Sequence, residues 1–317
     1  MAAARFVNPE VAAALSRLPP FEPVNASNLA AYRAARLAEL DSMVLSDDVV
    51  RTDIEVAGPP GAPAVSLRVH RPARGTPLRP CVYWMHGGGY VMGSARGDDV
   101  RFDRWCTRFD CVGIAVDYRL APETPYPGAL EDCFAGLRFV YDNADELGVD
   151  RSGLGIGGAS AGGGLAAALA LVARDRGGPP VAFQTLIYPM LDDRRVTPSS
   201  SWDVPIWKPA ANSFGWASYL GSLAGDEIPA YAAPARAADL AGLAPSLVIV
   251  GTADGFLDED IAYASRLNEA GVQVDLRVYA GAPHGFDFFT PDAAIARQAR
   301  RDVTEWMQGH LNPPRPT

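Results

Sequence analysis

The 317-residue sequence predicts an α/β fold in which helices flank both faces of an open, doubly wound and mostly parallel sheet. Continuous apolar runs rich in β-branched residues recur along the chain, and such runs are typical of strands buried on both faces. Segments with helical periodicity separate these runs, as parallel strands joined by crossover helices require. Hydrophobic residues make up 48% of the chain and charged residues 21%, which allows a sizeable core and excludes a disordered or fibrous protein.

The pattern of the first 45 residues predicts that this segment is helical. Helical spacing covers residues 9–18 and 26–45, and the apolar side chains of the second segment fall near one face. Two or three helices ahead of the first strand are too few to form a domain of their own. We therefore interpret residues 1–45 as N-terminal cap helices that pack on the rest of the protein.

Strands and helices alternate after this segment. Alternating apolar and polar residues in 50–56 and 65–69, on either side of a turn at 58–61, predict two antiparallel strands. Buried strands are expected at residues 81–85, 111–117, 154–156, 183–188, 247–250 and 272–279. Helices are expected at residues 98–109, 128–147, 161–174, 259–270 and 292–310.

Residues 191–240 interrupt the alternation between two strands. The interval is rich in tryptophan, proline and serine. In doubly wound sheets, ligands bind at the carboxyl edge of the strands, and we interpret the interval as a cap insertion that folds over this edge. The expected organisation is one unit, with an α/β core formed by residues 46–190 and 241–317.

Charge and cysteine usage limit the classes of partner. The net charge is −9, and no basic stripe is present, so we expect no nucleic-acid partner. The longest strongly apolar stretch, residues 161–173, is too short to cross a bilayer, and the N-terminus lacks an apolar secretory segment. The four cysteines show no CxxC spacing, which favours reduced and mostly buried thiols. These features predict a cytoplasmic protein without membrane attachment.

The strongest chemical signal is the sequence GASAG at 158–162, between a predicted strand and a predicted helix. This G-x-S-x-G pattern forms a sharp turn that presents a nucleophilic serine, and only very small residues fit around it. A glycine-rich turn with an incidental serine is the simplest alternative. A dinucleotide-binding loop is another, since 162–167 matches G-x-G-x-x-A, but this match begins inside the helix and leaves no glycines for the phosphate loop. We therefore predict that Ser160 is a nucleophile.

A second signal is the sequence HGGGY at 86–90, directly after a predicted strand. Consecutive glycines let backbone amides approach a developing oxyanion without obstruction by a Cβ atom, and each such donor is worth roughly 3 kcal/mol. Alone, the segment could be a flexible glycine turn. Beside the serine motif, it predicts an oxyanion-binding loop.

The chain has four histidines, so the base for the serine can be sought by elimination. His70 lies in an early predicted strand and His310 in the last predicted helix, while His86 is expected to orient the glycine loop through hydrogen bonds. His284 lies in a loop at the carboxyl end of a predicted strand, where a general base is needed. We predict His284 as the base, with a structural histidine as the alternative.

An acid that orients this histidine should follow another strand. Asp254 is the first acid after the predicted strand 247–250. Asp258, Glu259 and Asp260 instead resemble cap and first-turn residues of the next helix, where acids are electrostatically favoured. We predict Asp254 and keep Asp258 as the alternative. The resulting order of serine, acid and histidine is that of the α/β-hydrolase arrangement.

Two further features concern charge and metals. Arg119 and Glu123, in the sequence YRLAPE at 118–123, predict an internal ion pair that braces a loop near the site, with substrate binding as the alternative. The histidines and cysteines show no metal-ligand spacing, and neither H-E-x-x-H nor a Walker-type lysine occurs. We expect no metal and no cofactor.

Taken together, these motifs resemble those of the bacterial hormone-sensitive-lipase family of carboxylesterases. The shared segments are HGGG at 86–89, YRLAPE at 118–123, GASAGG at 158–163, the loop 254–258 and HGF at 284–286. The resemblance covers nearly the whole chain, and the segments at 188–194 and 207–209 are similar to the heroin-esterase type. Ala159 departs from the pattern, because many members carry aspartate there, and a hydrogen bond that supports the turn is expected to be absent.

The resemblance implies an α/β-hydrolase fold, with an eight-stranded and mostly parallel sheet under a helical cap. It also implies hydrolysis of short-chain acyl esters without a cofactor. By motif match, the oxyanion donors are the amides of Gly88, Gly89 and Ala161. Four aromatic residues are expected to line the substrate pocket, with core packing as the equal alternative for each: Tyr90, Trp207, Phe214 and Trp216.

The sequence thus predicts a serine carboxylesterase that acts on a small-molecule ester. An amidase or peptidase with the same triad remains an alternative. A non-catalytic small-molecule receptor on the same fold is another, although such receptors typically lose the histidine. The strand at 272–279 is a candidate edge through which two subunits would pair as a homodimer.

Overall fold

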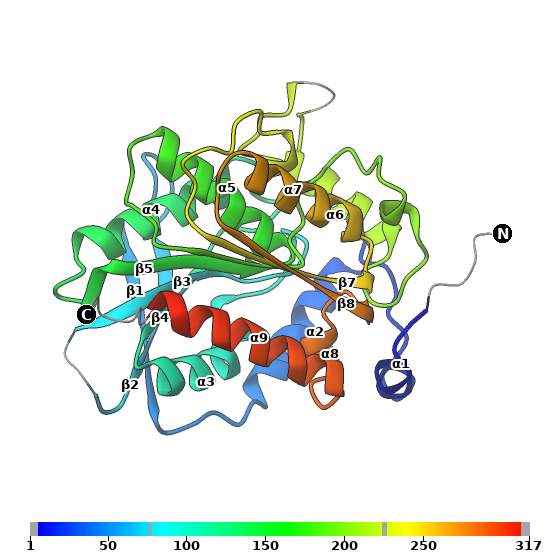
Figure 1. The fold of residues 1–317 in the computed structure, drawn as a ribbon, viewed down its shortest axis with the longest axis horizontal. Coiled ribbons are helices and arrows are strands. Elements are labelled where there is room, and N and C mark those ends of the chain that lie inside the picture. Colours follow the sequence, from blue (N-terminus) through cyan, green and yellow to red (C-terminus); the bar gives the residue numbers. More distant parts are fainter. Residues whose placement is uncertain (1–5, 76–77, 224–226, 312–317) are drawn as a thin grey trace.

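The computed structural model describes residues 6–75, 78–223 and 227–311, and in these residues eight strands form one sheet (Figure 1). Their order is β1-β2-β4-β3-β5-β6-β7-β8. Their bounds are β1 Val49–Val56, β2 Val65–Pro72, β3 Arg79–Met85, β4 Val112–Asp117, β5 Val149–Ala159, β6 Gln184–Ile187, β7 Ser246–Ala253 and β8 Val274–Pro283. The β1–β2 and β2–β4 pairs are antiparallel, and every other neighbouring pair is parallel. The predicted eight-stranded, mostly parallel sheet is confirmed.

Helices cover both faces of the sheet (Figure 1). One face carries α4 (Gly128–Asp142), α5 (Ala161–Asp175) and α7 (Leu257–Glu269), and the other carries α3 (Asp99–Phe109) and α9 (Ala294–Leu311). The buried apolar residues accordingly form two clusters. Side chains of a strand alternate between faces, so Tyr83 and Met85 of β3 belong to the first cluster while Val82 and Trp84 belong to the second.

Burial on both faces explains the continuous apolar runs of the central strands. All residues of β6 are buried. In β3 and in β4, all residues but one are buried. β5 is longer than the predicted 154–156 because glycines interrupt its apolar pattern. These glycines make room for aromatic rings: a Cβ atom on Gly155 would lie 2.1 Å from Phe183, and one on Gly157 would lie 2.7 Å from Trp84.

The N-terminal segment forms two helices, α1 (Pro9–Leu15) and α2 (Leu29–Asp41), each shorter than predicted. The start of α2 is delayed by a hydrogen-bonded turn. The side chain of Asn28 accepts a hydrogen bond from the backbone of Asn25 at 2.8 Å and donates one to the carbonyl of Pro23 at 3.1 Å. These bonds hold the preceding residues in a non-helical conformation.

The predicted ion pair between Arg119 and Glu123 is wrong. Arg119 pairs with Asp132 of α4 at 2.7 Å, whereas Glu123 pairs with Arg33 of α2 at 2.7 Å. The two residues of the loop therefore face different elements. The hydrogen bond from Arg33 lowers the pKa of Glu123 to about 2. Because Arg33 also donates to the carbonyl of Val91 at 2.8 Å, α2 is fastened to the loops that follow β3 and β4.

The insertion between β6 and β7 carries α6 (Pro209–Leu220), with short 3₁₀ turns at Ser199–Ser201 and Pro234–Arg236. A single helical turn, α8 (Phe286–Phe289), follows β8. β1 and β8 are the edges of the sheet, so the predicted edge position of strand 272–279 is confirmed. Pairing of two subunits through this edge stays a prediction.

The remaining expectations concern thiols and membranes. All four cysteines are buried, as predicted, and none forms a disulfide. Across the three described ranges, none of the helices is both long and apolar enough to span a bilayer. The same residues contain no cluster of three or more histidine, cysteine or acidic side chains arranged to hold a metal ion.

Candidate active site

Ser160 stands at the sharp turn between β5 and α5. Its φ of +57° and ψ of −123° lie in a region that L-residues rarely adopt, and such backbone strain is concentrated at functional sites. The turn has no space for larger neighbours. A Cβ atom on Gly158 would lie 2.1 Å from the carbonyl oxygen of Gly162, and one on Gly162 would lie 2.0 Å from the carbonyl oxygen of Met85.

His284 reaches the serine from the loop after β8. Its Nε2 atom lies 2.8 Å from the Oγ atom of Ser160. Both side chains are largely shielded from solvent, with exposed fractions of 6% for His284 and 7% for Ser160. The rings of Tyr188 and Phe256 pack against the imidazole in T-shaped arrangements, with their centres 4.8 and 5.0 Å from that of the imidazole. These contacts fix the plane of the ring.

Asp254 approaches the opposite side of the imidazole from the loop after β7. Its Oδ2 atom lies 2.9 Å from the Nδ1 atom of His284, and its Oδ1 atom accepts a hydrogen bond from the backbone of Phe256 at 3.0 Å. The carboxylate is 1% exposed. Because β5, β7 and β8 are parallel, their carboxyl ends meet at one edge of the sheet and bring the three side chains together.

Asp258, the alternative acid, lies elsewhere. Its carboxylate accepts a hydrogen bond from the backbone of Ser199 at 2.8 Å, and the hydroxyl of Ser199 accepts one from the backbone of Asp258 at 3.1 Å. This reciprocal pair joins the first turn of α7 to the insertion. The structure therefore brings Asp254, and not Asp258, to His284.

The glycine loop after β3 passes directly against Ser160. A Cβ atom on Gly87 would lie 3.5 Å from the Cβ of Ser160. Gly88 and Gly89 have φ angles of +127° and +61°, which glycine adopts without strain. Within the described part of the chain, no group accepts a hydrogen bond from the amides of Gly88, Gly89 or Ala161. Such amides are available to an oxyanion formed on the serine.

His86 holds the conformation of this loop. Its Nδ1 atom lies 2.8 Å from the carbonyl oxygen of Gly87. Tyr118 donates a hydrogen bond to the carbonyl of His86 at 2.7 Å, and the two rings stack with centres 4.1 Å apart. Burial lowers the pKa of His86, which favours its neutral form. The ring thus orients the glycine loop through hydrogen bonding and stacking.

Comparisons with known proteins identify the family of this chain. A family model described as the α/β-hydrolase fold matches residues 82–288. Esterase LipI of Mycobacterium tuberculosis is 34% identical over 255 residues, which cover 79% of this chain and 79% of the relative. The chain belongs to the hormone-sensitive-lipase family of carboxylesterases.

Two further relatives of this carboxylesterase cover even more of its length. Carboxylesterase NlhH of M. tuberculosis is 34% identical over 270 residues, 84% of each chain. The solved structure of a bacterial heroin esterase is 37% identical, with a TM-score of 0.92 over 97% of this chain and 98% of that one. The predicted α/β-hydrolase fold and the likeness to the heroin-esterase type are confirmed.

The carboxylesterase has a pocket of about 340 Å³ above Ser160. Trp207 of the insertion lies in its wall. The indole covers the glycine loop so closely that a Cβ atom on Gly89 would lie 2.3 Å from it, and its ring centre is 6.3 Å from that of His284. The structure therefore places Trp207 where it can contact a molecule bound at the serine.

The other three aromatic residues expected here do not line this pocket. Tyr90 is buried, stacks on Tyr219 with ring centres 4.0 Å apart, and donates a hydrogen bond to the carbonyl of Met190. Trp216 is 2% exposed and lies against Tyr90 with ring centres 5.4 Å apart. Phe214 packs against the same core cluster. Core packing, the alternative for each, describes these three residues.

Other aromatic residues of the pocket were missed by the sequence analysis. Phe21 comes from the N-terminal segment, Tyr188 from the end of β6, and Phe288 and Phe289 from α8. The two phenylalanines of α8 follow His284 by four and five residues, so their proximity to the base was a usable signal. Phe21 carried no signal, because its segment has no regular element that would indicate its position.

Two acids in the first turn of α7 are buried, which their sequence position does not suggest. Glu259 accepts hydrogen bonds from the backbones of Leu191 and Asp192 at 2.8 and 3.2 Å. Asp260 is fully buried, and neither of its carboxyl oxygens has a hydrogen-bond partner among the described residues. Burial raises the pKa of both carboxyl groups well above the usual range, and the charge of nearby Asp254 raises it further.

We predict that Asp260→Asn removes part of the pH dependence of stability. A raised pKa in the folded state means that folding takes up a proton. The contribution of Asp260 to wild-type stability must therefore fall as pH rises from the ordinary aspartate pKa, about 3.9, toward the folded value, by at most about 1.4 kcal/mol per pH unit. Asparagine cannot ionise, so the variant should gain stability relative to wild type as pH rises.

Urea unfolding of both proteins between pH 5 and pH 8 measures this difference. Asp47→Asn, at an exposed carboxylate, is the matched control and should follow the wild-type profile. If the Asp260→Asn and wild-type profiles stay parallel over this range, the buried carboxyl group is not the source of the slope.

Proposed function

We propose that this carboxylesterase hydrolyses small, short-chain acyl esters through a Ser160–His284–Asp254 triad and an acyl-enzyme intermediate. One observation carries the proposal: a continuous hydrogen-bond relay runs from the serine through the imidazole to the carboxylate, next to backbone amides that lack an acceptor in the described residues. A nucleophile, its base and an oxyanion site are the groups that acyl transfer requires.

In the first half-reaction, the Oγ atom of Ser160 attacks the ester carbonyl while Nε2 of His284 accepts its proton. Asp254 accepts the hydrogen bond from Nδ1–H and holds the tautomer with a free lone pair on Nε2. Negative charge develops on the carbonyl oxygen, which the amides of Gly88, Gly89 and Ala161 stabilise. His284 then protonates the leaving alcohol, and the acyl group remains on the serine.

The second half-reaction repeats these steps with water as the nucleophile. His284 accepts a proton from water, the hydroxyl attacks the acyl-enzyme carbonyl, and the same three amides stabilise the second oxyanion. Collapse of this intermediate releases the carboxylic acid and returns the proton to Ser160. No cofactor enters either step.

The size and lining of the pocket support a small apolar substrate. Its volume of about 340 Å³ is near the lower end of the range, about 300–1,000 Å³, that small-molecule sites usually have. Trp207, Tyr188 and Phe289 contribute aromatic rings to its walls. An acetyl or butyryl group with a compact alcohol fits such a space better than a long acyl chain.

We also propose that residues 1–45 and 191–240 act as a cap over the α/β core of residues 46–190 and 241–317. Both segments contribute walls to the pocket above Ser160, including Tyr32 and Arg36 from α2 and Trp207 from the insertion. The contacts of Arg33 with the loops after β3 and β4 fasten α2 in this position. Removal of water from a bound ester would then depend on both segments.

A panel of p-nitrophenyl esters from acetate to decanoate, together with the matched amide p-nitroacetanilide, tests the proposal. We expect the highest kcat/KM for acetate or butyrate, a decline of at least about tenfold by decanoate, and far lower activity on the amide because an amine is a poorer leaving group. A serine-reactive phosphonate should inactivate the enzyme, with the label on Ser160 by peptide mass spectrometry.

Each alternative gives a different result. Preference for the amide would indicate an amidase or peptidase, and binding of the esters without turnover would indicate a receptor. A phosphonate label on another residue would contradict the assignment of the nucleophile.

A further inference from the structure

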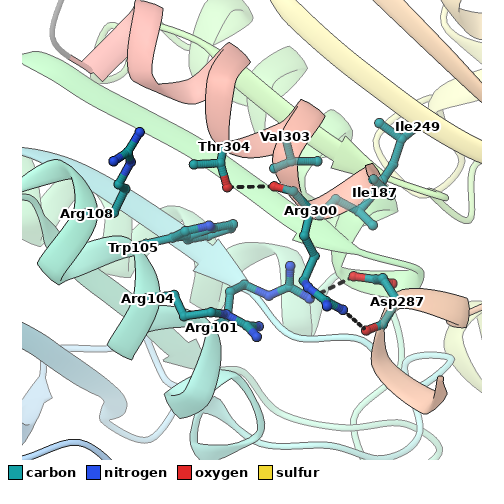
Figure 2. Close-up of a pocket in the computed structure, with 11 residues that line it drawn as sticks. Arg101, Arg104, Trp105, Arg108, Ile187, Ile249, Asp287, Arg300, Val303 and Thr304 are labelled. Atoms are coloured by element: carbon teal, nitrogen blue, oxygen red, sulfur yellow. Dashed lines mark hydrogen bonds and ion pairs between the residues drawn. The ribbon is translucent and has the colours of Figure 1, made fainter. Parts of the chain in front are cut away.

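A second pocket lies between α3 and α9, on the face of the sheet opposite α5 (Figures 1 and 2). Its volume is about 240 Å³. Four arginines line it, Arg101, Arg104 and Arg108 from α3 and Arg300 from α9, and we refer to it as the arginine pocket. It shares only Arg101 with the pocket above Ser160.

Positive charge is in excess at this pocket. Asp287 is the only acidic residue that lines it in the described part of the chain. Arg101 is paired, since it donates a hydrogen bond to Asp98 at 2.9 Å and lies 4.0 Å from Asp287 (Figure 2). Among the described residues, one lining carboxylate therefore faces four guanidinium groups, in a protein whose overall charge is −9.

In the described ranges, none of the other three arginines forms an ion pair, although the charges of Asp287 and Asp292 act on Arg300. Arg300 donates hydrogen bonds to the backbone carbonyls of Asp287 and Pro291, which are neutral acceptors. Among the described residues, neither Arg104 nor Arg108 has a hydrogen-bond acceptor or an acid within ion-pair distance. Partial burial of its guanidinium and the charges of Arg101 and Arg300 lower the pKa of Arg104, although the residue as a whole is exposed. A bound anion would relieve this repulsion.

Apart from Thr304, the rest of the lining is apolar. The indole of Trp105 forms one wall, and its ring also contacts the guanidinium of Arg101 at 5.3 Å. Ile187, Ile249 and Val303 also line the pocket. All four side chains are buried or nearly so. The pocket therefore offers an aromatic and aliphatic surface directly beside its charged groups.

We propose that the arginine pocket binds a small phosphate monoester with an apolar or aromatic body. The planar guanidinium group donates paired hydrogen bonds to phosphate oxygens, and arginines on two facing helices can surround a tetrahedral dianion from different sides. A dianion also suits the excess of positive charge in the lining. The apolar lining would contact the organic group, which gives the site a preference over inorganic phosphate.

Isothermal titration of the full-length chain with phenyl phosphate tests this inference. At about 0.01 M ionic strength, where the Debye length is near 30 Å, we expect saturable binding at one site that weakens as salt is added. Benzoate, which has the same ring and one charge, should bind at least about tenfold more weakly, because charge-assisted hydrogen bonds to phosphate are lost. Inorganic phosphate should also bind more weakly than phenyl phosphate.

Variants locate the site. The double variant Arg104→Gln/Arg108→Gln should weaken binding of phenyl phosphate by about tenfold or more, and Arg300→Gln should do so separately. Arg301→Gln is the matched control, because Arg301 is an exposed neighbour on α9 that does not line the pocket, and it should bind like wild type.

Three results would overturn the proposal. They are the absence of saturable binding to the wild-type chain, equal binding by wild type and the double variant, and benzoate binding as tight as that of phenyl phosphate. The guanidinium groups of Arg104 and Arg108 have no hydrogen bond or ion pair among the described residues, and removing them relieves repulsion, so the double variant should unfold thermally at or above the wild-type temperature. Loss of binding in a folded double variant would then report on the site itself.

Discussion

Ser160→Ala should lower kcat for p-nitrophenyl butyrate by about 10⁵- to 10⁶-fold. Alanine cannot form the acyl-enzyme, and the residual rate would come only from the oxyanion donors and from binding, as in serine hydrolases in which the nucleophile is removed. Substrate affinity should change little, because Ser160 contributes one hydroxyl to a pocket lined by many residues. The rate is measured with freshly purified protein under saturating ester.

Two controls make this prediction specific. Ser265→Ala, at an exposed serine on α7, should retain wild-type turnover. Ser160→Ala should also lose labelling by the phosphonate while keeping the wild-type unfolding profile. Turnover within tenfold of wild type would remove Ser160 from the mechanism and, with it, the acyl-enzyme.

That the three proposed triad side chains come together could be predicted from the sequence, because each of them follows a buried strand. The ends of parallel strands lie together at one edge, so residues far apart in the chain can be placed in one site from pattern alone. Ser160, Asp254 and His284 each occupy such an end. Steric demand at the turn adds a second constraint, which the glycines at 158 and 162 satisfy.

The walls of the pocket were harder to predict, because no periodic pattern orients a loop. Tyr90 ends the glycine loop and Trp216 lies in the insertion, but both side chains fill the core. Phe21, in contrast, reaches the pocket from a segment without regular structure. Phe288 and Phe289 belong to a single turn of helix, too short for hydrophobic periodicity to indicate which face is buried.

Charged residues were predicted least accurately. Sequence distance suggested that Arg119 pairs with Glu123, but their partners come from two different helices. Asp260 was predicted to lie in a first helical turn, a position that does not specify burial, and α7 packs that side of its first turn against the core. The arginine pocket depends on the packing of α3 against α9, which no local pattern specifies.

Asp254→Asn should lower kcat by about 10⁴-fold, with a much smaller effect on KM. The Oδ2 atom of Asp254 accepts the hydrogen bond from Nδ1 of His284 and is buried with it. An asparagine side chain can donate to this nitrogen, which favours the tautomer with the proton on Nε2. That tautomer cannot accept the proton of Ser160, so the nucleophile is not activated even though the geometry is kept.

Asp258→Asn distinguishes this role from a general effect of removing a carboxylate near the site. Asp258 follows Asp254 by four residues and lies in the first turn of α7. Its carboxylate contacts the backbone of Ser199 instead of the imidazole. Its amide replacement keeps an oxygen to accept that hydrogen bond, so kcat should remain close to wild type. If Asp258→Asn lowered kcat more than Asp254→Asn, Asp258 would have to be the acid that orients His284. The loop after β7 would then have to rearrange during catalysis to bring Asp258 to the imidazole.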